Sequence, residues 1–309
     1  MSARTPSGTD PPLCLLCGGP LRLLYPSNVP RGRAIEQDEV ACTSSYLSLH
    51  DDILICDPCG LARSVPTIAS DELAALYGAV EDPDYLVSEE ERRAGFRKAL
   101  TEMERYLPRG RRSVLEIGSA VGLFLEEARD KGWQATGIEP SRWASERART
   151  RGLDVFTGTL EDYDPKGKTF DAVVLWDVLE HLPDPVAALR RFGELLRPEG
   201  LVAFTTVNIG GLGARLFRGR WPWFMRMHLH YFTSRSLRAL VKREGFEPLR
   251  IATEPKILKL GYVLERAQGL FGPLATAGRW TAERLRLAER PVKIDLGDIL
   301  LVVARKLRP

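Results

Sequence analysis

Short apolar strands alternate with helical segments from residue 111 to the end of the chain, and this alternation constrains the fold more than any other feature. Predicted strands lie at 113–117, 133–138, 154–156, 170–176 and 200–206, with helices near 122–131, 141–151, 185–196 and 234–244. Strand–helix–strand units of this kind build a parallel sheet with helices on both faces. Two late strands, at 246–252 and 298–304, complete a predicted α/β fold with a doubly wound, mostly parallel, seven-stranded sheet.

A glycine turn joins the first of these strands to the helix after it. Residues 114–128 read VLEIGSAVGLFLEEA, in which Gly118 and Gly122 flank the turn. Glycine allows a tight turn and lets a ligand approach the backbone closely. Glu139 ends the next strand, where a carboxylate can accept hydrogen bonds from the ribose of a nucleoside. A G-x-G-x-x-G run is absent, which argues against a dinucleotide; a packing turn with a surface glutamate is the simpler alternative.

These residues resemble the class I S-adenosylmethionine (SAM)-dependent methyltransferases, whose first motif is E/D-x-G-x-G-x-G. Residues 116–122 match it with Ala120 in place of the middle glycine. Three further motifs follow in the family's order, at 158–162, 170–185 and 195–208. The resemblance is strongest to small-molecule O-methyltransferases of quinone biosynthesis and to their relatives in sugar, lipid and natural-product pathways. It implies a Rossmann-like fold, a SAM cofactor and methyl transfer.

The resemblance also implies contacts to the cofactor. In chain order, the expected cofactor-binding residues are Glu116, Gly118, Ser119, Gly122, Glu139, Leu160, Glu161, Trp176 and Asp177. Among them, Glu139 would hold the ribose, and Leu160 with Glu161 would flank the adenine. Trp176 and Asp177 end the fourth strand, at the edge where open α/β sheets bind their ligands.

His181 is the candidate catalytic base. Methyl transfer from a sulfonium is an in-line displacement, so the protein mainly aligns the nucleophile and removes its proton. His181 follows the fourth strand directly, and an imidazole titrates near neutral pH; packing of the turn before Pro183 is the alternative role. Asp177, Glu180 and His181 also match the D/E-x-x-E-H pattern that holds a divalent cation in some quinone O-methyltransferases, which leaves such an ion as an open alternative.

The five cysteines lie near the N-terminus, and four of them form two C-x-x-C-G knuckles. The first knuckle contains Cys14 and Cys17, and the second contains Cys56 and Cys59. Two such knuckles supply the four thiolates of a structural zinc site in a zinc-ribbon-like module. The long separation between them requires an inserted loop. A redox dithiol and reduced buried thiols are the alternatives, and Cys42 is expected to be a free thiol without a role.

A basic, aromatic segment at 208–235 follows the fifth strand. The resemblance to the methyltransferases implies a substrate lid at this position. From residue 210 onward it holds five arginines, six aromatic residues and no acidic residue. Arginine with aromatic side chains suits a phosphate, a sugar or a nucleotide-linked acceptor. Trp221, Arg226, His228 and His230 are the expected substrate-facing residues. RNA bases, a membrane interface and a lid that only packs on the domain are the alternatives.

These features divide the chain into three parts. They are a zinc-binding module with a disordered N-terminus at 1–67, a helical linker or cover at 68–110 and a methyltransferase domain at 111–309. In the linker, Ser88 and Glu91 predict a capping box. An insert at 254–297 is apolar on one face and basic on the other, which suits a membrane contact or a cover for a lipid-linked acceptor; an extra packed helix pair is the simpler alternative.

Composition narrows the partners and the location. The chain carries 44 Lys and Arg against 41 Asp and Glu, and a net charge of +3 does not indicate a nucleic-acid-binding protein. It contains neither an apolar signal segment nor an apolar run of the roughly 18 residues that a membrane span needs. We therefore expect a cytoplasmic enzyme acting on a small-molecule or lipid-linked acceptor. An RNA methyltransferase and a non-catalytic interaction protein with the same fold are the alternatives, and the sequence predicts neither the acceptor nor the oligomeric state.

Overall fold

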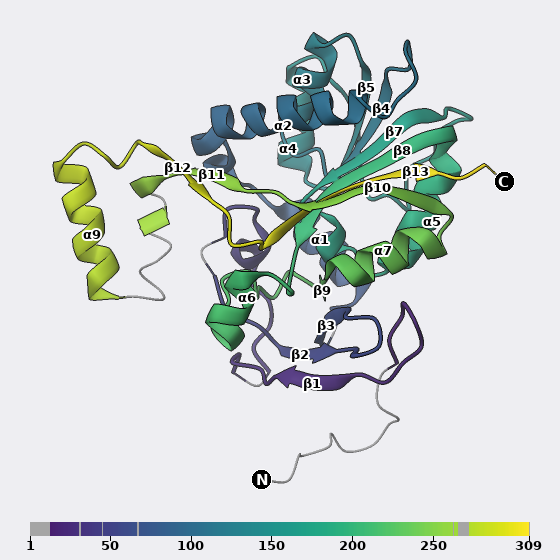
Figure 1. The fold of residues 1–309 in the computed structure, drawn as a ribbon. Helices are drawn as coiled ribbons and strands as arrows, with labels where there is room; N and C mark the ends of the chain where they lie inside the picture. Colours follow the sequence, from purple (N-terminus) through teal and green to yellow (C-terminus); the bar gives the residue numbers. More distant parts are fainter. Residues whose placement is uncertain are drawn as a thin grey trace.

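The computed structural model describes residues 13–308, except for 31, 45, 67, 262 and 265–271. The disordered start predicted for the first dozen residues lies outside this part of the chain. Two sheets dominate the structure (Figure 1). The smaller one combines three strands from the N-terminal part of the chain with a fourth strand from much later in the sequence.

The larger sheet has seven strands in the order β10-β13-β8-β7-β4-β5-β6. Their bounds are β4 (Ser113–Ile117), β5 (Gln134–Glu139), β6 (Asp154–Thr157), β7 (Phe170–Trp176), β8 (Leu196–Val207), β10 (Phe246–Thr253) and β13 (Ile299–Lys306). The five strands from β8 to β6 pair in parallel, whereas β13 pairs antiparallel with both β8 and β10. The predicted mostly parallel, seven-stranded Rossmann-like sheet is confirmed.

Helices cover both faces of this sheet (Figure 1). One face packs against α2 (Glu89–Glu104), α3 (Leu123–Asp130) and α4 (Arg142–Thr150), and the other against α5 (Pro185–Leu195) and α7 (Ser234–Arg243). Successive strand residues point to opposite faces, so Val114 contributes to the first core and Leu115 to the second. Because both faces are covered, β4 is buried along its whole length.

Helix starts follow the sequence signals in part. Asp184 precedes Pro185 and its side chain accepts hydrogen bonds from two backbone N–H groups of α5, as the N-cap residues of helices do. The capping box predicted at Ser88 is wrong, because its side chain makes no capping hydrogen bond. A short 3-10 helix, η2 (Pro83–Ser88), runs directly into α2, so the backbone at Ser88 is not extended as a capping residue requires.

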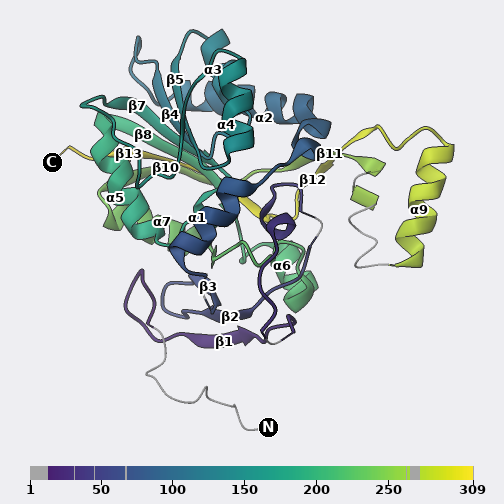
Figure 2. The ribbon, with the colours of Figure 1, turned by 180° about the vertical axis from the view of Figure 1, so that it is seen from behind.

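The smaller sheet has four antiparallel strands and is shared by two distant segments. Its strands are β1 (Arg22–Tyr25), β2 (Asp52–Ile55), β3 (Ala62–Val65) and β9 (His230–Tyr231). The first three come from the cysteine-containing module, and β9 comes from the segment expected to form the lid. The two views agree that this sheet lies below α1 (Ser70–Ala79) and away from α2 and α3 (Figures 1 and 2). The N-terminal module and the lid are therefore one structural unit.

Four further short elements lie in the loops. They are η1 (Gln37–Val40), η3 (Leu179–His181), α6 (Leu212–Phe217) and η4 (Arg218–Arg220). The insert begins with β11 (Lys256–Lys259), continues to α9 (Pro273–Arg284) and returns through β12 (Pro291–Ile294), which pairs antiparallel with β11. It projects from the body in both views (Figures 1 and 2). Of the helix pair considered for the insert, the structure describes α9, and part of the remainder lies outside the described residues.

Candidate active site and cysteine cluster

A cavity of about 1740 Å³ lies at the carboxyl ends of β4, β5 and β7. Its wall includes Gly118 after β4, Glu139 at the end of β5 and Asp177 after β7. The carboxyl ends of parallel strands are where open α/β sheets bind their ligands. The linker, the N-terminal module and the lid complete the wall, so the cavity joins parts of the chain that are far apart in sequence.

The turn after β4 has an unusual backbone. Gly118, Ala120 and Gly122 have φ angles of +72°, +47° and +85°. A Cβ at Gly122 would lie 2.3 Å from Leu153 Cδ1 and 3.2 Å from Ala148 Cβ, and together with the positive φ these contacts favour glycine here. Ala120 adopts the left-handed region without being glycine, which costs about 1–2 kcal/mol. Such strain is common at ligand sites, and here it directs the Ala120 N–H to Glu139 Oε2 at 2.7 Å.

Two buried carboxylates lie beside this turn. Glu139 accepts hydrogen bonds from the backbone N–H groups of Ala120 (2.7 Å) and Ser141 (2.8 Å). Burial raises the pKa of Glu139 to about 7, although these two bonds act in the opposite direction. Burial, followed by the charge of Glu139, raises the pKa of Glu116 well above its usual value. Glu116 Oε2 has no hydrogen-bond partner among the described residues, as expected beside a site that a polar ligand completes.

The cavity wall includes eight of the predicted cofactor, catalytic and substrate residues. They are Gly118, Glu139, Leu160, Glu161, Trp176, Asp177, His181 and His228. Glu116, Ser119 and Gly122 are not on the wall, and the side chains of Glu116 and Ser119 are buried.

His181 lies in η3, and its ring is held at one nitrogen. Nδ1 is 3.0 Å from the carbonyl oxygen of Met227 and 2.9 Å from the Tyr77 hydroxyl. Because a carbonyl only accepts hydrogen bonds, the contact with Met227 assigns the proton to Nδ1 and leaves a lone pair on Nε2. Burial lowers the pKa of His181 to about 4, while the Met227 carbonyl and Asp177 oppose this shift. The imidazole is therefore neutral at pH 7.

His228 from the lid packs against His181, with ring centroids 4.8 Å apart. Its Nδ1 is 2.8 Å from the carbonyl oxygen of Trp223. Burial, followed by the neighbouring His181, lowers the pKa of His228 to about 3. Glu180, His181 and His228 each offer one ligand atom, and these atoms lie within 4.8 Å of one another. This group differs from the predicted trio, because Asp177 instead accepts a hydrogen bond from Thr205 Oγ1 at 2.8 Å.

The other lid residues expected to face the acceptor are not on the cavity wall. Trp221 is buried against Phe224 and Tyr231. The Arg226 guanidinium contacts Asp51 at 3.2 Å and donates to the carbonyl oxygens of Arg33 and Ala34 in the N-terminal module. His230 lies in β9, with Nε2 3.2 Å from the Pro183 carbonyl oxygen. These three side chains hold the lid in position.

The helical linker and the N-terminal module supply wall residues that the motifs did not indicate. Tyr77 contacts His181, and Tyr85 lies under the Arg92 guanidinium, with 4.0 Å between the guanidinium carbon and the ring centroid. Cys42 is also on the wall, where its side chain is exposed. Tyr77 lies in α1 and Tyr85 in η2, and neither belongs to a recognisable motif, so the sequence offered no signal for them.

The end of the cavity near the lid is mostly apolar. Its wall there includes Val40, Leu47, Trp223, Met225 and Met227. None of the five lid arginines lies on this wall. The arrangement does not support the phosphate-binding role suggested by the arginine content of the lid.

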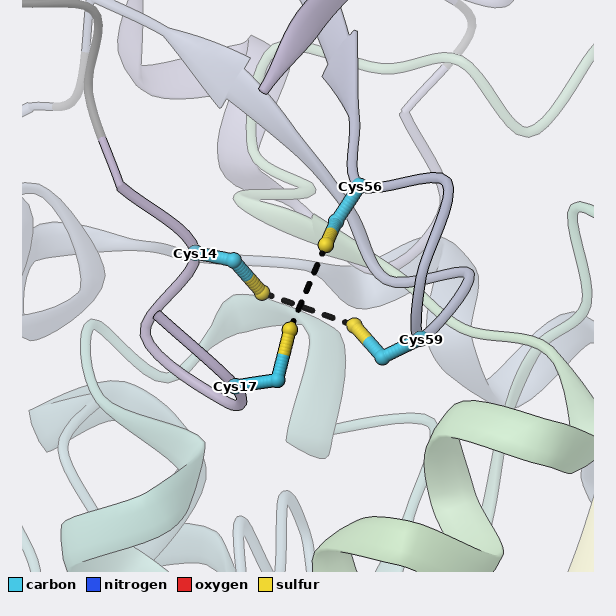
Figure 3. Close-up of side chains that lie close together, drawn as sticks. All are labelled: Cys14, Cys17, Cys56 and Cys59. Atoms are coloured by element: carbon cyan, nitrogen blue, oxygen red, sulfur yellow. Dashed lines mark hydrogen bonds between the residues drawn. The ribbon is translucent and has the colours of Figure 1, made fainter. Parts of the chain in front are cut away.

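The four knuckle cysteines converge on one point (Figure 3). Their sulfur atoms lie within 4.8 Å of one another, with Cys14 and Cys59 Sγ at 3.5 Å and Cys17 and Cys56 Sγ at 3.4 Å. The two knuckles are closed alike: the N–H four residues after the first cysteine of each donates to that cysteine's carbonyl oxygen at 2.7 Å. Tetrahedral zinc with Zn–S bonds of about 2.3 Å places its sulfurs about 3.8 Å apart, so this set fits the ion closely.

Comparison with known proteins identifies the class. Residues 88–251, more than half of the chain, match the family described as "Methyltransferase domain". The chain belongs to this methyltransferase family. The match begins at residue 88, inside the predicted linker at 68–110.

The ubiquinone biosynthesis O-methyltransferase of Alkalilimnicola ehrlichii is 36% identical over 104 residues, which cover 31% of this chain and 42% of that protein. The Vibrio campbellii protein of the same name is 32% identical over 104 residues, covering 31% and 44%. The chain thus spans less than half the length of these curated relatives. A solved SAM-dependent methyltransferase from Archaeoglobus fulgidus covers 73% of this chain and 100% of its own, at 19% identity and a TM-score of 0.48.

Proposed function

We propose that this protein transfers a methyl group from SAM to a hydroxyl or carbon of a small, largely apolar metabolite. One observation carries the proposal: a single cavity runs from the glycine turn and Glu139 to the His181 and His228 pair. The apolar end of that cavity favours an acceptor with a ring or chain, such as a natural product or the apolar part of a lipid-linked sugar. No observation favours RNA.

The strand ends supply the cofactor half of the site. Glu139, already oriented by two backbone N–H groups, would accept hydrogen bonds from the ribose hydroxyls. Leu160 and Glu161 would flank the adenine, and Trp176 with Asp177 would lie beside the methionine moiety. When bound, SAM supplies an activated methyl group on a cationic sulfur. The acidic side chains at this end of the wall suit that charge.

His181 would take the proton of an acceptor hydroxyl at Nε2. Its lowered pKa keeps the imidazole neutral and able to accept a proton at pH 7. Tyr77 and Met227 fix the ring, and the negative charge of Asp177 stabilises the imidazolium that forms. The apolar wall around the acceptor excludes water, which strengthens these interactions.

The four knuckle cysteines would hold a structural zinc ion. Zinc in such a site replaces part of the hydrophobic core that a small module lacks. The proposal keeps the cytoplasmic location expected from the sequence, since thiols stay reduced there. Among the described residues, no helix is long and apolar enough to cross a bilayer.

Calorimetric titration with S-adenosylhomocysteine tests the cofactor half. Glu139→Ala should weaken binding by about 10- to 100-fold, because hydrogen bonds to a charged group are worth about 1.5–3 kcal/mol. Glu146→Ala, on the exposed surface of α4, is the matched control and should bind as the wild type does. An unchanged dissociation constant in a folded Glu139→Ala variant would remove the assignment.

A further inference from the structure

Helix α9 of the insert exposes an apolar face. Leu274 is 80% exposed, and Trp280 and Leu285 are each 61% exposed. Ala275 and Ala282, seven residues apart, are buried on the opposite face, so the helix packs through its small residues and presents the large ones to solvent. Single exposed apolar side chains are ordinary, but several on one helix face mark a contact surface.

The same part of the insert is strongly basic. Residues 273–294 contain five Arg or Lys and two Glu, so they carry a net charge of +3, as large as that of the whole chain. The Arg284 guanidinium carbon lies 5.4 Å from the ring centroid of Trp280, which places a cation directly beside the exposed apolar face. Apolar and aromatic side chains bordered by arginine are the composition of helices that lie in a lipid interface.

A second element of the same kind is attached to the base of the insert. The N–H groups of Leu212 and Gly213, at the start of α6, donate to the Leu296 carbonyl oxygen at 2.8 and 3.2 Å. Leu212 and Leu216 are more than 60% exposed, and the arginine between them is exposed as well. Both views place α6 and α9 on the same side of the molecule (Figures 1 and 2).

We propose that α9 and α6 dock the protein on an anionic lipid bilayer. Leu274, Trp280 and Leu285 would enter the interface, and the arginines would face anionic headgroups, each worth about 1 kcal/mol near such a surface. The charge argues against a second copy of the chain as the partner, because two equally basic helices would repel and protein interfaces exclude charge from their centres.

Docking in this way would bring the cavity next to the membrane. Lys293, Ile294 and Leu296, at the base of the insert, lie on the cavity wall. An amphiphilic acceptor could then pass from the bilayer to the apolar end of the cavity. This consequence rests on the proposed function, whereas the docking itself does not.

Flotation of the full-length, zinc-loaded protein with lipid vesicles tests the docking. At low salt the protein should float with phosphatidylcholine vesicles containing phosphatidylglycerol, and much less with phosphatidylcholine alone. The triple variant Leu274→Ser, Trp280→Ser, Leu285→Ser should bind at least about tenfold less, since each buried CH₂ contributes about 0.8 kcal/mol. Leu23→Ser with Leu307→Ser, two exposed leucines outside the insert, is the matched control and should float as the wild type does.

Tryptophan emission gives a second readout. Among the described tryptophans, Trp280 is the exposed one, so its emission should shift to shorter wavelength on anionic vesicles. Absence of flotation at low salt, or equal flotation of the triple variant, would overturn the proposal. So would a stable dimer in sedimentation velocity that the triple variant abolishes. A protein that floats but fails to bind S-adenosylhomocysteine would retain the docking surface and lose the proposed function.

Discussion

The two sheets of this molecule are built in opposite ways. In the seven-stranded sheet, four parallel strands and the helices between them follow one another along residues 113–176, and the loops after all four strands reach the cavity. In the four-stranded sheet, β3 pairs with β9, so Ala62 lies opposite Tyr231. The first sheet presents the end of the cavity proposed for the cofactor, and the second holds the lid at the end proposed for the acceptor. A local architecture thus builds the proposed cofactor site, and a long-range architecture builds the proposed acceptor site.

Loss of the proposed zinc ion should produce the largest difference in stability between the two sheets. Cys56→Ser removes one of four ligands, and apparent zinc affinities of about 10–16 kcal/mol in small domains show how much folding energy depends on such a site. We expect metal content to fall from about one zinc per chain to almost none. We also expect the four-stranded sheet to melt at lower temperature than the seven-stranded one.

Elemental analysis and circular dichroism would measure these two effects. Cys42→Ser is the matched control, because Cys42 lies outside the cluster and should leave both unchanged. Wild-type protein without zinc, or a Cys56→Ser variant that keeps it, would contradict the account.

Replacing His181, the proposed base, should lower turnover and leave cofactor binding unchanged. In His181→Asn the amide can still donate to the Met227 carbonyl, but it is far too weak a base to accept a proton. We expect turnover to fall by about 10²–10⁴, with unchanged affinity for S-adenosylhomocysteine. Tyr77→Phe, which removes only the hydroxyl beside Nδ1, should cost less than this. Initial rates on the best acceptor from a panel of hydroxylated ring compounds would decide, and an active His181→Asn variant would exclude the role.

Acid should destabilise the side of the molecule that contains the lid. Burial lowers the pKa of His181, His228 and His230 to about 4, 3 and 4. The unfolded chain therefore binds these protons first, and the free energy of unfolding, highest above about pH 6.5, falls as the pH drops toward 4. At pH 5 each imidazole costs about 2 kcal/mol. Glu139, whose pKa is raised to about 7, offsets part of this loss, and so do Glu116 and Asp298, whose pKa values burial also raises.

Thermal unfolding across this range measures the effect. The melting temperature should fall between about pH 7.5 and pH 5, and His228→Gln should flatten the slope. An equal pH slope in the wild type and in His228→Gln would show that this imidazole is accessible to solvent.

The buried ion pair between lid and module should matter more than an exposed one nearby. Arg226→Ala leaves Asp51 without this partner and Glu39 with Arg33 alone, and should cost about 2–4 kcal/mol. Arg22→Ala removes an exposed pair with Asp57 and should change stability little, because water screens that interaction. Urea unfolding measures both, and equal effects would mean that Arg226 does not anchor the lid.

The strands of the seven-stranded sheet could be predicted from the sequence more closely than those of the four-stranded sheet, for physical reasons. The bounds of β4 and β7 were predicted to the residue because both are buried apolar runs between turn residues. β8 begins at Leu196, four residues earlier than expected, because pairing with β7 extends it into a polar stretch. In contrast, the β3–β9 pairing involves segments far apart in the chain, and a two-residue strand has no periodicity to detect.

The same reasoning explains which site residues were predicted. Glu139 and Asp177 follow strands whose ends meet at one edge, so strand order alone brings them together. Trp221, Arg226 and His230 were chosen by chemical type, and their burial depends on partners in the N-terminal module. Tyr77 and Arg92 lie in helices whose contact with the cavity depends on tertiary packing.

Hydrogen–deuterium exchange with and without S-adenosylhomocysteine would test the division between the two sheets most directly. The account predicts slower exchange at residues 117–123, 139–141 and 158–162, with β1, β2 and β3 unchanged. Slowing confined to the four-stranded sheet, or none in the turn after β4, would contradict it.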